Sequence, residues 1–243
     1  MQIFSRTDRG LVRETNQDNY CSGFSEDNSV TWAVVCDGMG GQNGGNIASE
    51  MAVRSVEKKM KAAYKDLKDS DKREEILVKI IKDVNKEIFK KSCSKLSLSG
   101  MGTTIELVCI CDNKISVAHV GDSRIYMIQD DQIKQLTKDH SLVQEMVDLG
   151  QLTPEQAKVH PYKNLITRAM GISKHIKVDY LELDAPENYT LVLVSDGLTN
   201  HVSDDEILFT IKDNPVEYVP DMLIEIANER GGSDNITVVL VLA

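Results

Sequence analysis

Two stretches of the sequence end a hydrophobic run on Asp-Gly, and the carboxylates at these two ends could do chemistry. In residues 30–45 (VTWAVVCDGMGGQNGG) the run stops at Asp37, and in residues 190–197 (TLVLVSDG) it stops at Asp196. Such runs are typical of buried strands, so each strand would carry one carboxylate at its tip. The glycine beside each acid has no Cβ and leaves room for a ligand near the backbone. We interpret the pair as the framework of an active site.

Three further aspartates occupy comparable positions. Asp122 follows a hydrophobic run, Asp234 precedes one, and Asp18 lies in the polar segment before another. Turn formation alone explains most single aspartates at strand ends, and this interpretation stays open for each acid taken singly. Carboxylates that converged would repel one another by roughly 4 kcal/mol per pair at 4 Å and an effective dielectric constant of 20. A hard divalent cation removes this repulsion, and aspartates together with a backbone carbonyl, such as that of Gly38, suit Mg²⁺ or Mn²⁺.

An arginine in the same polar segment, Arg13, is a candidate ligand for an anion. A guanidinium group offers two parallel donors to a phosphate, a geometry that an ammonium group cannot match. A surface arginine without a ligand fits the sequence as well, so the isolated residue leaves both interpretations open.

Other chemistries find no support in the spacing of residues. The glycine-rich loop lacks the Lys-Ser/Thr pair of a phosphate-binding P-loop and belongs to no βαβ unit, and no G-x-S-x-G sequence is present. Zinc is not expected, because the five histidines show no ligand spacing and the five cysteines contain no CxxC pair. Buried thiols in a reducing compartment explain the cysteines. The histidines are His119, His140, His160, His175 and His201, and the cysteines are Cys21, Cys36, Cys93, Cys109 and Cys111.

The composition of the 243 residues limits the partners. The formal net charge is −10, from 38 acidic and 28 basic residues, which argues against nucleic acid or an anionic membrane as a partner. With 41% hydrophobic residues the chain can build a substantial core. The first ten residues lack a hydrophobic signal core, and no apolar stretch approaches the length of a membrane span. We therefore expect a soluble, cytoplasmic protein.

Periodic patterns predict an α+β fold. Hydrophobic residues recur at helical spacing over residues 47–63 and 76–88, so two consecutive helices are expected there. Four short strands follow at residues 104–111, 114–120, 123–129 and 132–136, the first and last pairs joined by two-residue hairpin turns. This meander requires antiparallel pairing and excludes a doubly wound Rossmann sheet. Further on we expect a helix at 140–150, an irregular stretch at 151–171, strands at 177–183 and 190–195, helices at 204–212 and 216–229, and a last strand at 236–242.

Six short motifs occur in an order and spacing that resemble the bacterial metal-dependent protein phosphatases of the PP2C (PPM) type, over essentially the whole chain. The motifs are Arg13…Asn16-Gln17-Asp18, Asp37-Gly38-Met39-Gly40-Gly41, Ser99-Gly100-Met101-Gly102-Thr103-Thr104, Gly121-Asp122-Ser123-Arg124, Ser195-Asp196-Gly197 and Ser233-Asp234-Asn235-Ile236-Thr237-Val238. The resemblance implies a four-layer α-β-β-α sandwich of two antiparallel sheets flanked by helix pairs. It also implies a single domain over residues 1–243, with a mobile flap subdomain at about 140–172 that includes His160, Pro161, Asn164 and Arg168.

The resemblance further implies the roles of the candidate residues. Asp37 would bridge two Mn²⁺ or Mg²⁺ ions, the Gly38 carbonyl would bind one of them, and Asp122 would hold a third, weaker ion that shares Asp196. Asp18, Asp196 and Asp234 would complete the ligand set, directly or through water, and Arg13 would bind the phosphate. A water bridging the two ions would attack phosphorus in line, so no protein nucleophile would be needed.

The sequence departs from parts of the family at the proton donor for the leaving group. Animal members carry a histidine where this chain has Met39, and many bacterial members carry one at the position of Gln42. Our hypothesis is therefore that a metal-bound water, and not a residue such as His160, protonates the leaving alkoxide.

The substrate implied by the resemblance is a phosphoserine or phosphothreonine protein, with a bacterial Ser/Thr protein kinase acting in opposition and the phosphatase acting as a monomer. Two alternatives stay open at this point: a phosphatase-like binding module that has lost activity, and a hydrolase of small phosphate esters.

Overall fold

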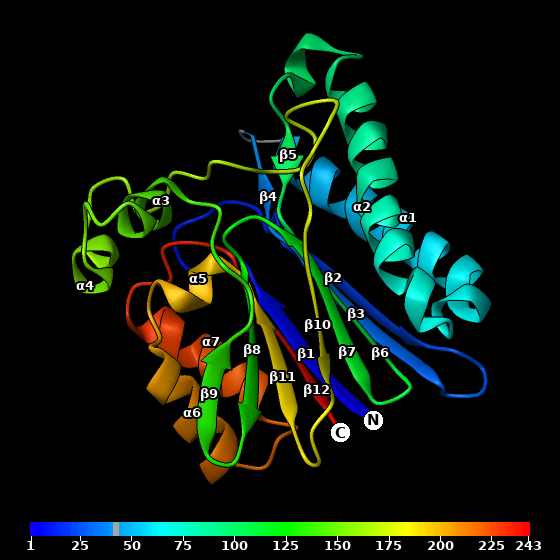
Figure 1. The fold of residues 1–243 in the computed structure, drawn as a ribbon. Coiled ribbons are helices and arrows are strands. Elements are labelled where there is room, and N and C mark those ends of the chain that lie inside the picture. Colours follow the sequence, from blue (N-terminus) through cyan, green and yellow to red (C-terminus); the bar gives the residue numbers. More distant parts are fainter. Residues whose placement is uncertain (41–43) are drawn as a thin grey trace.

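The structure, a computed structural model, describes residues 1–40 and 44–243. Two five-stranded antiparallel sheets lie face to face, and helices cover the outer face of each sheet (Figure 1). The four-layer α-β-β-α sandwich that we expected is thereby confirmed. None of the helices in the described part of the chain combines the length and the hydrophobicity needed to cross a membrane.

Every neighbouring pair of strands in the two sheets is antiparallel. In spatial order, the first sheet consists of β1 (Gln2–Asp8), β12 (Ile236–Leu242), β11 (Thr190–Val194), β8 (Arg124–Gln129) and β9 (Gln132–Gln135). The second consists of β10 (Asp179–Asp184), β7 (Lys114–Val120), β6 (Ile105–Cys111), β3 (Val30–Cys36) and β2 (Asn19–Phe24). A separate short ribbon pairs β4 (Gly38–Met39) with β5 (Gly102–Thr103).

Two long helices, α1 (Gly44–Leu67) and α2 (Ser70–Ser92), pack on the second sheet, and α6 (Asp204–Asp213) and α7 (Val219–Glu229) pack on the first. The remaining helical segments are the 3₁₀ turn η1 (Leu96–Leu98), α3 (Leu142–Asp148), α4 (Pro154–Lys158) and α5 (Asp196–Thr199). Three hydrophobic cores result, one under each helix pair and one between the sheets. Fully buried members of these cores, such as Trp32, Leu223 and Leu193, each contribute roughly 1.5–3 kcal/mol.

The hairpin turns of the expected meander are present, but the meander itself is only partly right. Asp112, Asn113, Asp130 and Asp131 have φ angles between 49° and 62°, as two-residue type I′ turns require. β7 and β8 do not pair, however, because residues 121–123 carry the chain from the second sheet to the first. Gly121, with a φ of 134°, turns the backbone out of the second sheet at this point.

The stretch 151–171, which we expected to be irregular, contains the short helix α4. Its start is stabilised by a capping box, in which the Thr153 hydroxyl accepts the Gln156 N–H and the Gln156 side chain accepts the Thr153 N–H. Pro154 occupies the first turn, where its missing N–H costs nothing. Proline therefore starts a helix here and does not mark a loop.

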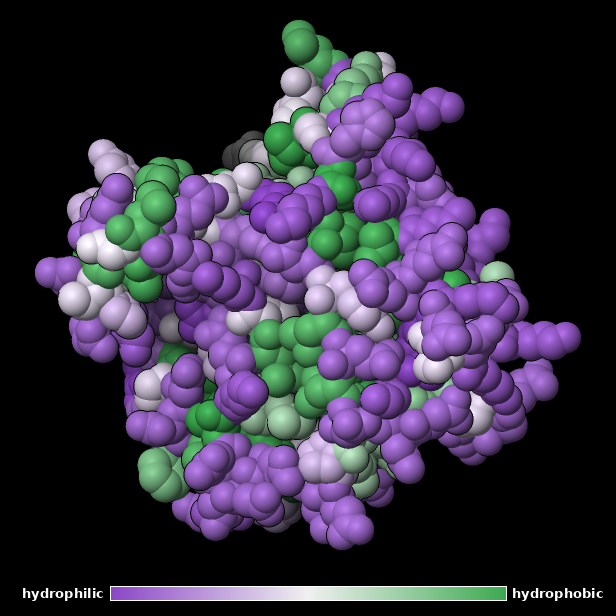
Figure 2. All heavy atoms as spheres, in the orientation of Figure 1, coloured by the Kyte–Doolittle hydropathy of each residue, from purple (hydrophilic) through white to green (hydrophobic). Residues whose placement is uncertain are grey.

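The chain termini lie at one end of the sandwich, while the β4–β5 ribbon and α3–α5 lie at the other (Figure 1). Hydrophilic side chains cover most of the face shown in Figure 2, while hydrophobic ones gather at its centre and, separately, over the α3–α4 segment. In this segment Leu149 and Val159 are 72% and 82% exposed. The end of the sandwich with α3–α5 is also the end at which the predicted acids come together.

Candidate metal centre

The five predicted aspartates come from separate elements and meet at this end of the sandwich. Asp18 precedes β2, Asp37 follows β3, Asp122 lies in the link between the sheets, Asp196 begins α5, and Asp234 precedes β12. Burial raises the pKa of the Asp37 carboxyl well above its usual range, and repulsion by each of the other four aspartates adds to this rise. The sequence therefore builds a cluster of mutually repelling acids.

Asp18 lies deepest in the cluster and is 4% exposed. Its Oδ2 accepts hydrogen bonds from the hydroxyls of Ser195 and Thr237, both at 2.7 Å. Its Oδ1 has no hydrogen-bond partner among the described residues. Burial raises the pKa of Asp18 from 3.8 to about 7, although the two hydroxyls oppose the rise. Ser195 and Thr237 belong to motifs that we identified, but the sequence did not indicate that they orient Asp18.

The backbone of Asp37 is held on both sides. Its N–H donates to the Thr104 hydroxyl at 2.9 Å, and its carbonyl accepts from the Thr104 N–H at 2.8 Å and the Thr103 hydroxyl at 2.9 Å. The next residue, Gly38, donates its N–H to the Gln17 carbonyl at 3.2 Å. A Cβ at Gly38 would lie 2.3 Å from the Gly45 carbonyl oxygen, so no other residue fits at this position.

Asp122 and Asp196 line the same two cavities. Burial raises the pKa of Asp122 well above its usual range, and repulsion by Asp196 is the largest electrostatic contribution to this rise. The pKa of Asp196 rises from 3.8 to about 6, chiefly through burial and then through repulsion by Asp234. Its Oδ2 accepts a hydrogen bond from the Asn200 side chain at 3.2 Å. Oδ1 of each of these two acids has no partner in the described part of the chain.

Arg13 and Asp234 form the more exposed side of the cluster. Arg13 Nη2 lies 2.7 Å from Asp234 Oδ2, and the arginine side chain is 53% exposed. Asn235 fixes the loop that carries Arg13, because its amide donates to the carbonyls of Arg9 (2.8 Å) and Thr15 (3.0 Å) and its Oδ1 accepts the Gln17 N–H (2.8 Å). No pattern in the sequence indicated this role of Asn235.

A cavity of about 710 Å³ opens onto the cluster. Its walls include Arg13 and four of the aspartates, while Asp18 lies beneath it. Met39 also lines the cavity, and no histidine is among the described residues that do. Gln42, the other position discussed for a proton donor, lies outside the described residues. The cavity is large enough for a phosphorylated side chain together with cations.

The chemistry of the donor set fits hard divalent cations. Asp18, Asp122 and Asp196 each present one buried carboxylate oxygen that no described residue satisfies. Buried carboxylate oxygens normally have partners, and the pKa values of these acids are raised chiefly by burial and further by repulsion from neighbouring aspartates. All-oxygen ligands of this kind suit Mg²⁺ or Mn²⁺.

The expected flap region contains α3 and α4 and borders the cavity only in part. Asn164, Leu165 and Ile166 line the cavity, whereas His160 does not. Arg168 does not line this cavity and forms an ion pair with Asp179 at 2.7 Å. A second cavity of about 510 Å³ separates the flap from α5 and α6 and reaches Asp122 and Asp196 from the other side.

The spacing of the histidines and cysteines in the sequence shows no metal-ligand pattern. The structure brings His119, His140 and Asp179 together, with ligand atoms within 4.8 Å of one another, a grouping that the chain spacing did not indicate. All five cysteines are free; Cys36, Cys109 and Cys111 are buried, whereas Cys93 is exposed.

Comparison with known proteins identifies the class to which this fold and site belong. A family model described as protein phosphatase 2C matches residues 10–237. The chain therefore belongs to the protein phosphatase 2C family. Members of this family are metal-dependent, in agreement with the acid cluster.

Curated relatives define the activity more closely. The chain is 41% identical over 237 residues to the serine/threonine phosphatase Stp of Listeria monocytogenes, covering 97% of this chain and 93% of the relative. It is 40% identical over 244 residues to the protein phosphatase PhpP of Streptococcus pneumoniae, covering 99% and 97%. The chain is accordingly a serine/threonine phosphatase.

Solved structures agree with this assignment. The serine/threonine phosphatase of S. agalactiae superposes with a TM-score of 0.91 at 38% identity, covering 98% of each chain. The catalytic domain of the serine/threonine phosphatase PstP, solved in complex with two manganese ions, superposes with a TM-score of 0.85 at 31% identity, covering 100% of this chain and 98% of that one.

Proposed function

We propose that this phosphatase hydrolyses phosphoserine and phosphothreonine in proteins by means of two Mn²⁺ or Mg²⁺ ions bound in the acid cluster. Asp37 would bind both ions, the Gly38 carbonyl one of them, and Asp18, Asp196 and Asp234 would complete the ligand set directly or through water. The observation that supports this proposal best is the set of buried carboxylate oxygens, at and near the wall of the 710 Å³ cavity, that have no hydrogen-bond partner among the described residues. Bound ions would supply a nucleophile at neutral pH by lowering the pKa of a water between them.

The protein holds these acids in place before any cation arrives. The hydroxyls of Ser195 and Thr237 fix Oδ2 of Asp18, while Oδ1 accepts no hydrogen bond from the described residues. Thr103 and Thr104 fix the backbone that carries Asp37. Ligands that are already oriented need little reorganisation when a cation binds. The electrostatic repulsion between the gathered carboxylates destabilises the metal-free fold, and bound cations would offset it.

Arg13 would bind the phosphoryl group. Its guanidinium lies at the rim of the cavity beside Asp234, half-exposed and able to offer donors to a second acceptor. Two parallel N–H groups match two phosphoryl oxygens, so Arg13 would orient the phosphate and offset the charge on its oxygens during transfer. Exposed ion pairs contribute little to the stability of a protein. Weakening the Arg13–Asp234 pair when Arg13 binds the substrate would therefore cost little free energy.

The outer part of the cluster would hold a third, weaker ion. Asp122 and Asp196 both line the two cavities, and each has one oxygen without a hydrogen-bond partner among the described residues. Repulsion by Asp196 is the largest electrostatic contribution to the raised pKa of Asp122, which supports an ion shared by these two acids.

The leaving alkoxide would take its proton from water and not from a histidine of the chain. Met39 stands at the cavity wall and carries no transferable proton. His160 does not line the cavity, and its Nδ1 accepts the Tyr162 N–H at 3.2 Å within the flap.

The substrates would be phosphoproteins, with a Ser/Thr protein kinase as the opposing enzyme, and we propose a single domain, with the flap at about 140–172, that acts as a cytoplasmic monomer. These proposals rest on the family and on the names of the relatives, which describe serine/threonine and protein phosphatases.

The test is phosphate release from a phosphothreonine peptide, first in EDTA and then with Mn²⁺ or Mg²⁺ restored. Wild type, Asp37→Ala and the control Asp66→Ala, an exposed aspartate at the end of α1, are compared after circular dichroism has shown that each is folded. Release that needs metal and is lost only in Asp37→Ala supports the proposal. Folded wild-type protein that releases nothing with any metal contradicts it and favours a binding module. Release from a small phosphomonoester in preference to the peptide favours a small-ester hydrolase.

A further inference from the structure

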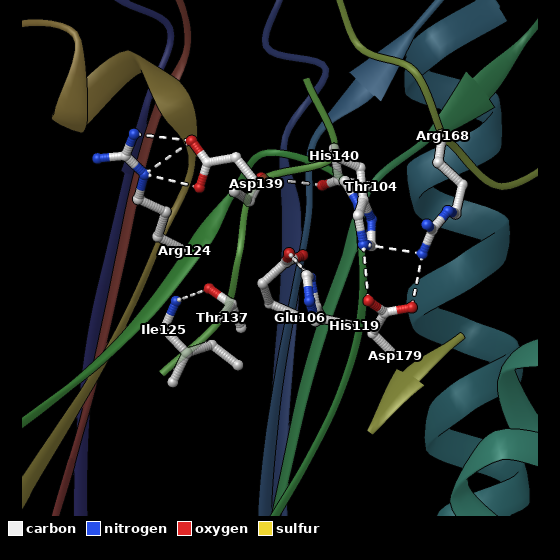
Figure 3. A network of polar contacts seen from close by, with 12 residues as sticks. Thr104, Glu106, His119, Arg124, Ile125, Thr137, Asp139, His140, Arg168 and Asp179 are labelled. Carbon is white, nitrogen blue, oxygen red and sulfur yellow. Dashed lines mark hydrogen bonds and ion pairs between the residues drawn. The ribbon is translucent and has the colours of Figure 1, made fainter. Parts of the chain in front are cut away.

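A row of polar side chains crosses the second sheet, and most of them are buried (Figure 3). Glu106 on β6 is paired in register with His119 on β7, which is paired in turn with Asp179 on β10. Glu106 is fully buried and His119 is 3% exposed. His140, 7% exposed, stacks on His119 with ring centroids 4.6 Å apart and planes inclined by 9°. Buried polar groups in such number need a reason, and the proposed chemistry of the acid cluster does not use them.

His140 binds Gly121, the residue before Asp122, through both its side chain and its backbone. The Gly121 N–H donates to the ring atom His140 Nδ1 at 3.0 Å, and the backbone N–H of His140 donates to the Gly121 carbonyl at 2.8 Å. Gly121 has a φ of 134° and approaches Thr104 so closely that a Cβ would lie 2.5 Å from it. Side chain and backbone of one histidine therefore fix the strained turn from which Asp122 projects.

The other side of the His140 ring faces Asp179 and Arg168. Because Nδ1 accepts the Gly121 N–H, the proton of the neutral ring lies on Nε2, which is 3.3 Å from Asp179 Oδ2. Arg168 donates to Asp179 Oδ1 at 2.7 Å, and its Nη1 lies 2.8 Å from Nε2. With the proton on Nε2, this last contact joins two donors, so Asp179 is the acceptor that holds both His140 and Arg168.

His140 is also the base of the flap. Its backbone carbonyl accepts the Thr167 N–H at 2.8 Å. Two residues further on, the Leu142 N–H donates to the Leu165 carbonyl at 2.9 Å. The two ends of the flap are thus closed on each other at His140, and Arg168 follows immediately on the returning side. Any movement of the flap base is transmitted to the ring that holds Gly121.

A metal ion bound by His119, His140 and Asp179 is a less suitable explanation for this cluster. The guanidinium of Arg168 already lies at the position from which a cation would contact Asp179 and His140 Nε2. Arg168 thus neutralises Asp179, and a second cation at the same place would be repelled. The cluster functions as a support for its neighbours.

We propose that His140 is a positioning residue that couples the flap to Asp122, with the Asp179–Arg168 pair holding its ring. The inference rests on the proposed function in one respect, namely that Asp122 binds a divalent ion. His140 sets the orientation of Asp122 through Gly121, and its ring meets the returning end of the flap at Arg168.

Two substitutions of His140 separate this role from simple filling of space. In His140→Asn the side-chain oxygen occupies the place of Nδ1 and can accept the Gly121 N–H. In His140→Phe the ring and its stacking on His119 are kept, but the acceptor is lost. Asp179→Ala releases the ring from its other partner, and Asp184→Ala, on the same strand but 88% exposed, is the matched control.

Two measurements are made without substrate. Electron paramagnetic resonance of free Mn²⁺ gives the number and affinity of bound ions, and hydrogen–deuterium exchange gives the protection of residues 142–165. We expect His140→Phe to weaken the most weakly bound Mn²⁺ about tenfold, the effect of leaving one buried donor unsatisfied, and to increase exchange in the flap. His140→Asn and Asp184→Ala retain the wild-type Mn²⁺ affinity, while Asp179→Ala increases flap exchange.

Unchanged Mn²⁺ affinity and unchanged flap exchange in His140→Phe overturn the inference, as does a His140→Asn variant as impaired as His140→Phe. Should His140→Phe fail to fold, wild-type flap exchange in Asp179→Ala overturns it equally. In all these cases wild-type enzyme still binds Mn²⁺ and releases phosphate. Wild-type protein that binds no Mn²⁺ at all contradicts the proposed function and the inference together.

Discussion

Asp18 allows a test in which one substitution should have opposite effects on stability at two pH values. Burial raises the pKa of this carboxyl from 3.8 to about 7 in the metal-free fold. The folded state therefore binds the proton more tightly than the unfolded state does. The resulting stabilisation is fully present below pH 3.8 and is lost as the pH rises through about 7. At pH 8 the ionised Asp18 destabilises the metal-free protein.

The rise in pKa from 3.8 to about 7 corresponds to about 4 kcal/mol at 1.36 kcal/mol per pH unit. Asp18→Asn removes the buried charge, and its carbonyl oxygen can still accept from Ser195 and Thr237. Its amide group takes the place of Oδ1 and has no acceptor among the described residues, which costs about 1–3 kcal/mol. The net expectation is that the variant is more stable than wild type by about 2 kcal/mol at pH 8 in EDTA. At pH 4.5, where Asp18 is protonated, the variant should be less stable.

The assay is thermal and urea unfolding in EDTA at pH 4.5 and pH 8, with Asp66→Asn on the exposed surface as the control. A difference of 2 kcal/mol should shift the melting temperature by roughly 4–8 °C. With Mn²⁺ present the order should reverse at pH 8, because the variant loses a ligand and with it the stabilisation that binding gives the native state. A variant that is destabilised equally at both pH values in EDTA would refute the idea that repulsion and desolvation dominate at this carboxyl.

Two further predictions concern the chemistry. Arg13→Lys should lower kcat/KM for a phosphothreonine peptide about tenfold, because one ammonium cannot match two phosphoryl oxygens, and steady-state phosphate release measures this; wild-type kinetics would exclude Arg13 as the phosphate ligand. His160→Ala should leave the pH–rate profile unchanged, because His160 does not line the cavity. If a limb at about pH 6–7 disappears in His160→Ala, the flap histidine and not water protonates the leaving group.

Local patterns in the sequence predicted the strand tips well, for a physical reason. A hydrophobic run that ends on Asp-Gly specifies both a buried strand and the exit of the chain from the sheet, and both features are encoded within a few residues. Asp37 and Asp196 were located in this way. Gly38 is required by the close approach of the Gly45 carbonyl at the start of α1, a contact that only the structure shows.

The partners of these acids could not be predicted, because they come from distant parts of the chain. Asp18 is fixed by Ser195 and Thr237, which are 177 and 219 residues away. Each lies in a motif that suggested a nearby acid, yet a hydroxyl next to an aspartate in sequence does not reveal which carboxylate it will bind in space.

The crossing of the chain between the sheets explains why the sequence did not indicate that His119 and His140 lie together. Hydrophobic alternation in β7 and β8 shows which faces are buried but not which strands pair, so the link at residues 121–123 resembles a hairpin turn in the sequence. Because the chain changes sheets there, Asp122 belongs to neither sheet and needs support from elsewhere. His140 provides this support through the Gly121 backbone, and the register of β7 places His119 beneath its ring. A residue whose importance arises from such a crossing leaves no periodic signal, and the cluster of buried polar side chains around it is the feature that identifies it.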